Sequence, residues 1–226
     1  YDAFVLADAS SRALATTEPK LILVDAAHLA PNAPAAFNCT AVRRRRPGKV
    51  TLRDYDPAKP SFQLESSTEA GKDIERAAEV YQAPGGFGTP SDGDRRARLL
   101  LESLRAEAQT IQFDTNAVSL APGRMVELEP SPDLRSTTAA PCGKYFIIAV
   151  EHTYRRDAAE STHRVSAIPL EVPYRVPRTT PRPVITGVHS ALVTGPPGEE
   201  IHTDDRGRVR LHFHWDRDQA ADDKSS

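Results

Sequence analysis

Residues 181–217 decide the fold of this chain, and they read PRPVITGVHSALVTGPPGEEIHTDDRGRVRLHFHWDR. From residue 209 to residue 215 apolar and polar side chains alternate strictly, with the apolar side formed by Val209, Leu211, Phe213 and Trp215. A period of two is typical of a half-buried strand. The sequence therefore predicts a strand over residues 209–215 with one face in a core and the other in water.

The residues before this strand predict a hairpin. Residues 203–208 gather Asp and Gly, so we expect a tight turn in which Gly207 takes a positive φ. An earlier strand is predicted over residues 191–193, and the Gly-Pro-Pro-Gly run at 195–198 closes it. Short strands with tight turns suggest the opening of a small oligonucleotide/oligosaccharide-binding (OB) barrel, which needs about five strands. Because the chain stops at Ser226 and begins at Tyr1 without an initiator Met, we expect it to be an internal fragment.

The composition narrows the class of protein. With 29 basic and 31 acidic residues the net charge is -2, which gives no reason to expect nucleic acid or an anionic membrane as the main partner. A length of 226 residues fits one large or two modest domains. No apolar run approaches the roughly 18 residues of a membrane-spanning helix. Cys39 and Cys142 lie far apart without metal spacing, so we interpret them as buried or unpaired thiols.

One amphipathic helix is predicted, over residues 94–108, and Ser91 is expected to cap its start. Its apolar face is formed by Ala97, Leu100, Leu101, Leu104 and Ala108. Further strands are predicted over residues 20–25, 49–55, 124–129, 144–154 and 163–169. Residues 26–36 are expected to be a connection rich in Pro and Ala, and the four arginines at 43–46 a solvated turn. The pattern of residues 74–81 fits a helical turn or a surface strand.

Candidate chemical residues are few. The spacing of His212 and His214 on one strand places both imidazoles on the same face, and with His202 they could hold zinc or iron in a metal-dependent hydrolase. Ordinary barrel burial explains the same spacing. Glu199 and Glu200 are adjacent, so on a strand they point to opposite faces and cannot share one scissile bond.

No nucleophile elbow or phosphate-binding loop occurs in the sequence. His152 and His163 are interpreted as isolated histidines on strands. We therefore predict no catalytic, cofactor-binding or metal-ligating residues and no enzymatic activity.

Several short motifs together resemble the VgrG family, the trimeric spike proteins of type VI secretion systems. They are Thr-Pro-Arg-Pro at 180–183, Gly-Pro-Pro-Gly-Glu-Glu-Ile at 195–201, Thr-Asp-Asp-Arg-Gly-Arg-Val at 203–209 and Phe-His-Trp-Asp-Arg at 213–217. Arg-Asp-Tyr-Asp at 53–56, Tyr81 with Pro-Gly-Gly-Phe at 84–87, and Ala-Ile-Pro at 167–169 resemble motifs of the family's hub. Phe87 stands where the family often has Tyr.

The resemblance implies a mainly β fold. Residues 1–180 would form part of a hub of tube-like β-barrels with one amphipathic helix, and residues 181–226 the start of a truncated OB-fold spike domain. It favours a strand and turn at residues 74–81. In the small barrel it implies a core of Leu211, Phe213 and Trp215. Possible contacts between subunits are Glu199, Glu200, Arg208 and Arg217.

The resemblance also implies a mechanical role without a cofactor. Three copies would cap a hexameric Hcp-like tube, contact baseplate proteins, and carry a PAAR-like tip protein and effectors on a C-terminal needle. The particle would assemble in the bacterial cytoplasm and then be secreted or injected into a target cell. One alternative is the baseplate hub of a contractile phage or related particle. A second is the hydrolase that uses His202, His212 and His214.

Overall fold

The computed structural model describes residues 10–25, 33–132, 141–154, 161–199, 202–218 and 221–222. The chain divides into two compact units, Tyr1–Pro177 and Arg178–Ser226, and each is described by itself. Among the described residues no helix combines the length and the hydropathy needed to cross a membrane.

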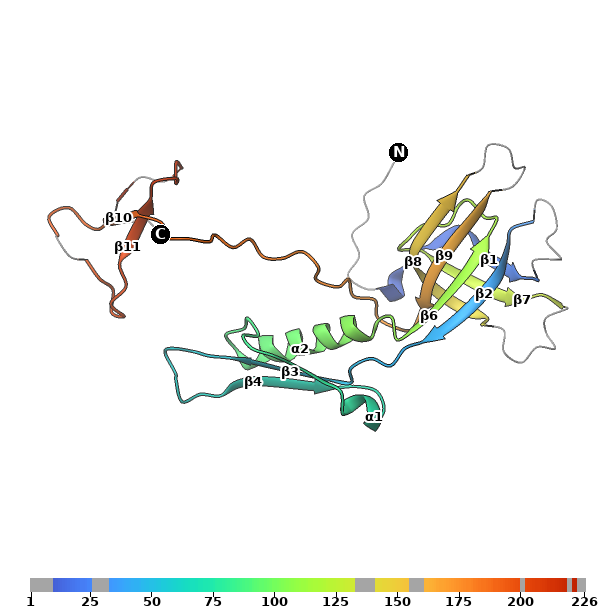
Figure 1. Cartoon of the computed structure of the whole chain (residues 1–226), viewed down its shortest axis with the longest axis horizontal. Coiled ribbons are helices and arrows are strands. Elements are labelled where there is room, and N and C mark those ends of the chain that lie inside the picture. The colour runs from blue at the N-terminus through green and yellow to red at the C-terminus, as the bar shows by residue number, and fades with distance from the viewer. Residues whose placement is uncertain are drawn as a thin grey trace. The chain divides into compact units, whose positions relative to one another are not determined.

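Unit 1 is built around a closed barrel of six strands in the order β1-β2-β6-β9-β8-β7 (Figure 1). The bounds of its elements are Ser10–Arg12 for the 3-10 helix η1, Ala15–Leu23 for β1, Ala35–Arg43 for β2, Gln109–Thr115 for β6, Met125–Pro130 for β7, Gly143–Thr153 for β8 and Thr162–Pro169 for β9. Strand β1 runs parallel to both β2 and β7, and this pairing closes the barrel. The mainly β barrel fold expected for the hub is thus confirmed.

The barrel interior is filled by apolar side chains from all six strands. Its largest fully buried members include Leu21, Ile111, Phe113, Leu128 and Ile147. They occupy alternate strand positions, which point to the same side of a sheet. Strands β2 and β6 were not predicted, and the expected connection over 26–36 is wrong at its end, because Ala35 and Ala36 are buried in β2. Residues 26–32 lie outside the described residues.

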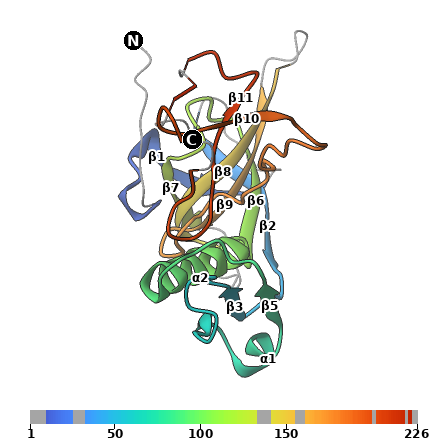
Figure 2. The ribbon, with the colours of Figure 1, turned by 90° about the vertical axis from the view of Figure 1, so that its left-hand side faces the viewer.

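A second layer is inserted between β2 and β6. It comprises β3 (Lys49–Asp54), β4 (Leu64–Glu69), α1 (Asp73–Arg76), β5 (Glu79–Gln82) and α2 (Pro90–Arg105). The three strands form a sheet in the order β4-β3-β5, and α2 lies across it (Figure 2). A separate core of Val50, Leu52, Leu64, Phe87, Ala97 and Leu101 joins the helix to the sheet. Unit 1 therefore has two hydrophobic cores.

Helix α2 begins four residues before the predicted start and ends at Arg105. Thr89 caps it, since its hydroxyl accepts the backbone N–H of Asp92 at 3.3 Å. Pro90 then occupies the first turn, where a fixed φ and a missing N–H cost nothing. The predicted cap at Ser91 is wrong, because this residue lies inside the helix. The predicted apolar face is confirmed for Ala97 and Leu101, which are buried.

Residues 74–81 contain both structures that their pattern allowed. A single helical turn, α1, ends at Arg76, and strand β5 follows from Glu79. Strand β5 pairs in parallel with β3, with Val80 opposite Val50. The resemblance correctly favoured a strand, but only for the second half of this segment.

The described part of unit 2 contains two strands, β10 (Ala191–Thr194) and β11 (Arg210–Phe213), paired antiparallel. Strand β11 is shorter than predicted, because the chain turns after Phe213. Trp215 was predicted as a core residue, yet it is 59% exposed and stacks on the Phe213 ring with centroids 5.1 Å apart. The physical reason is that the described residues of this two-stranded sheet supply no second layer to cover the ring.

Candidate functional site

The Asp54 carboxylate holds together two motifs that are distant in sequence. One oxygen accepts the backbone N–H of Tyr55 at 2.8 Å, and the other accepts those of Gly86 at 2.6 Å and Phe87 at 3.2 Å. These hydrogen bonds hold the pKa of Asp54 below its ordinary value, and the bond from Tyr55 has the largest effect. The Arg-Asp-Tyr-Asp motif therefore fixes the Pro-Gly-Gly-Phe turn rather than presenting a free acid.

The Phe87 ring is the hydrophobic end of this arrangement. It is 6% exposed and lies between the turn that precedes it and helix α2. A Cβ built on Gly85 would lie 2.6 Å from the ring, and one on Gly93 would lie 2.5 Å from it. Both contacts are too short for any side chain, so glycine is required on each side of the ring. Gly93, a weak helix former, is explained by this close approach.

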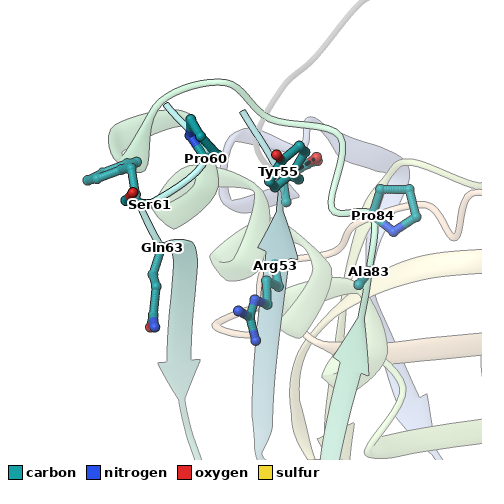
Figure 3. A pocket seen from close by; sticks show the side chains of 9 residues that line it. Arg53, Tyr55, Pro60, Ser61, Gln63, Ala83 and Pro84 are labelled. Atoms are coloured by element: carbon teal, nitrogen blue, oxygen red, sulfur yellow. Dashed lines mark hydrogen bonds between the residues drawn. The ribbon is translucent and has the colours of Figure 1, made fainter. Parts of the chain in front are cut away.

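A pocket of 550 Å³ opens beside this turn, at the end of the three-stranded sheet (Figure 3). Residues from the end of β3, the β3–β4 connection and the end of β5 line it, and they are Arg53, Asp54, Tyr55, Pro60, Ser61, Phe62, Gln63, Ala83 and Pro84. Tyr55 is 63% exposed and Phe62 48%. The lining offers aromatic rings and a guanidinium but neither histidine nor cysteine. It is suited to noncovalent contact with another molecule.

The turn of unit 2 is organised by Asp204. Its carboxylate accepts the backbone N–H groups of Arg206 and Arg208 at 2.9 Å each and pairs with the Arg208 guanidinium. The contacts from Arg208 come first in lowering the pKa of Asp204 to about 2. Gly207 has φ 72°, so the predicted hairpin turn with a positive φ is confirmed.

The four residues predicted to contact other subunits are placed as follows. Glu199 pairs with His202 at 2.7 Å and Arg208 pairs with Asp204, so both have partners within the chain. Arg217 is exposed and lines a shallow hollow with Trp215. Glu200 lies outside the described residues. Their role between subunits stays a prediction.

The histidines considered for a hydrolase do not form a metal cluster. His202 bonds to Glu199, His212 lies on β11, and His214 follows that strand in a turn. Over the ranges that the structure describes, no group of three or more His, Cys, Asp or Glu side chains could hold a metal ion.

His152 and His163 were predicted to be isolated, and this is wrong. They face each other across β8 and β9, with their Nδ1 atoms 3.1 Å apart. His163 is completely buried, and its Nε2 has no hydrogen-bond partner among the described residues. The pKa of His163 is lowered, mainly because the ring is buried and to a smaller extent because His152 lies beside it. Tyr154 packs against both rings, with centroids 6.2 Å from His152 and 5.3 Å from His163.

Unit 1 is a closed β-barrel with an inserted layer of helix and sheet. Its Asp54 carboxylate binds backbone N–H groups of a turn, so the class of protein that these features define is a structural β-barrel module. The family model described as phage tail baseplate hub (GPD) matches residues 2–158. The chain belongs to this family.

Curated relatives are type VI secretion system spike proteins. The chain is 29% identical over 201 residues to VgrG1c of Pseudomonas aeruginosa. This alignment covers 84% of the present chain and 27% of VgrG1c. The chain is 34% identical over 196 residues to VgrG4b of the same organism, covering 80% and 24%. The chain thus spans about a quarter of the length of these relatives. The VgrG resemblance is confirmed.

Among solved structures, the E. coli c3393 protein aligns with a TM-score of 0.46 and 19% identity. The alignment covers 87% of this chain and 39% of that one. That protein is described as a component of the type VI secretion system with structural similarity to the T4 bacteriophage tail proteins gp27 and gp5.

Proposed function

We propose that this chain is part of a VgrG-like hub and spike of a type VI secretion system. The observation that carries the proposal is the match of the hub family to residues 2–158, together with about 30% identity to spike proteins over some four fifths of the chain. In this role residues 1–180 belong to the hub, and residues 181–226 begin an OB-fold spike domain.

The proposed action is mechanical. Three copies form a ring through repeated head-to-tail contacts, a common route to closed oligomers. The ring caps a hexameric tube protein and contacts baseplate proteins, while a PAAR-like tip protein and effectors ride on a needle beyond this segment. The assembled tip is built in the bacterial cytoplasm and then ejected to puncture a target membrane. No cofactor or catalytic residue in this segment is needed.

The test is the mass of the assembly in solution, by light scattering on the full-length protein that contains this segment, alone and mixed with the tube protein of the same organism. We expect a trimer that binds the tube hexamer. A full-length protein that stays monomeric at every concentration and does not bind the tube protein would contradict the proposal.

The description of the matching family favours a second candidate, the baseplate hub of a contractile phage or phage-derived particle. The neighbouring genes separate the two. Sheath and membrane-complex genes support secretion, whereas capsid and tail-assembly genes support a phage particle.

A further inference from the structure

The paired imidazoles at the end of the β8–β9 hairpin need an explanation that the hub role does not supply. His152 is exposed and His163 is completely buried, and the two residues are direct cross-strand partners. Two neutral imidazoles share one Nδ1–H between their facing nitrogens. The buried Nε2 of His163 has no hydrogen-bond partner among the described residues, and it carries the ring proton when Nδ1 serves as a metal ligand.

The two Nδ1 atoms have the spacing of neighbouring ligands on one metal ion. At a zinc–nitrogen distance of about 2.05 Å, a tetrahedral ion separates its ligand nitrogens by about 3.3 Å. The observed separation is 3.1 Å, so only a small movement of the exposed His152 ring is required.

The orientation of the rings agrees with convergence on one point. Their centroids are 4.6 Å apart and their planes are inclined by 69°. The centroids are therefore only 1.5 Å farther apart than the nitrogens. Two rings placed end to end would add a full ring radius on each side, and their lone pairs would point straight at each other. The observed separations exclude that arrangement, in which no ion could bind both nitrogens.

We propose that His152 and His163 form a two-ligand site for a divalent transition-metal ion, with Nδ1 of each ring as the ligand and water in the remaining positions. Imidazole ligands suit Zn²⁺, Cu²⁺ and Ni²⁺, and not Mg²⁺ or Ca²⁺. His152 gives access from solvent, whereas His163 is held by the barrel. Tyr154 packs on both rings and limits their rotation.

The site joins strands β8 and β9 near their ends, next to the last pair, Thr153 and Thr162. An ion that binds only the folded chain raises stability according to its concentration and Kd. Bound metal is therefore expected to raise the Tm of the barrel. With two protein ligands among the described residues, the ion exchanges with solvent and joins the two strands reversibly, unlike a structural zinc with four protein ligands.

The test is calorimetric titration of the untagged 226-residue chain with ZnCl₂. The background carries His212→Gln and His214→Gln, which remove the other closely spaced histidine pair. We expect one Zn²⁺ per chain. Loss of a ligand's outer hydrogen-bond partner alone costs about 10- to 100-fold in affinity, so His152→Gln should raise the Kd by about tenfold or more. His152 is exposed, and an unchanged Tm without metal shows that this variant folds.

A second measurement locates the ion. Long-range proton–nitrogen NMR correlations should show Zn²⁺ shifting the imidazole nitrogens of His152 and His163 in the wild-type chain. Failure to bind Zn²⁺, equal affinity after His152→Gln, or unshifted nitrogens in this pair while zinc binds elsewhere would each overturn the proposal.

Discussion

Replacement of Phe87 by Ala should unfold the inserted layer while sparing the barrel. The ring is 6% exposed, and its walls include the backbone of Gly85 and Gly93, which have no side chains that could move into the space. Two walls of the cavity therefore cannot close on it, and core Phe→Ala changes cost about 3–5 kcal/mol. We expect the replacement to lower the free energy of unfolding of the inserted layer by about 4–5 kcal/mol, the upper half of that range.

The assay is urea denaturation followed by far-ultraviolet circular dichroism, because α2 is the main helix of the described chain. Hydrogen exchange of peptides from α2 and from strand β9 shows which core opens. Phe62→Ala is the matched control, since that ring is 48% exposed, and its cost should stay within about 0.5 kcal/mol. A loss below about 1 kcal/mol for Phe87→Ala, or equal loosening of α2 and β9, would refute the reasoning.

Three more outcomes follow from the same structure. Gly93→Ala adds a Cβ 2.5 Å from the Phe87 ring, so overpacking of about 1–3 kcal/mol should outweigh the gain of about 1 kcal/mol in helix propensity, seen as a lower urea midpoint. The pKa of Asp54 is lower in the folded chain than its ordinary value of 3.8, so its hydrogen bond to the Gly86 amide is complete above pH 3.8 and is lost as pH falls through the folded pKa. Protection of the Gly86 amide from hydrogen exchange should fall over the same pH range. Asp54→Ala should remove this protection at every pH. Burial raises the pKa of Cys39 to about 11, so only about one thousandth of its side chains are thiolates near pH 8. Iodoacetamide should therefore label Cys142, whose pKa is raised less, before Cys39. Equal labelling rates by mass spectrometry would contradict this.

Local pattern predicted strands such as β3 and β9, but β6 was overlooked although Ile111 and Phe113 alternate with polar neighbours. It missed β2, because a register shift between Phe37 and Thr40, with Asn38 at φ 51°, breaks the alternation. Closure of the barrel could not be predicted from local pattern either, since it depends on the parallel pairing of β1 with β7, which are about a hundred residues apart. The contact of Asp54 with Gly86 was not predicted, because nothing in the two segments specifies their meeting; the family resemblance singled out both motifs without joining them.

The histidine pair shows how one residue decides a site. Along β8 and β9 the ladder pairs Ile147 with Ala167, and an unbroken ladder would place His152 opposite Thr162. An irregularity between Ile147 and Ala149 shifts the register by one residue and brings His152 opposite His163. A shift of one residue exchanges the faces of a strand, so sequence alone could not place these rings together.

The segment that leaves unit 1 is fastened to both of its modules. The Tyr174 ring packs on Phe146 of the barrel strand β8 with centroids 5.4 Å apart. One residue later, the Arg175 guanidinium bonds to Glu102 of α2 at 2.8 Å, and the Ser103 hydroxyl donates to the Arg175 carbonyl. A pull on the chain beyond this point is therefore shared between the barrel and the inserted layer. Sharing of this kind is what the proposed mechanical role needs, because force on residues 181–226 would reach unit 1 through this segment.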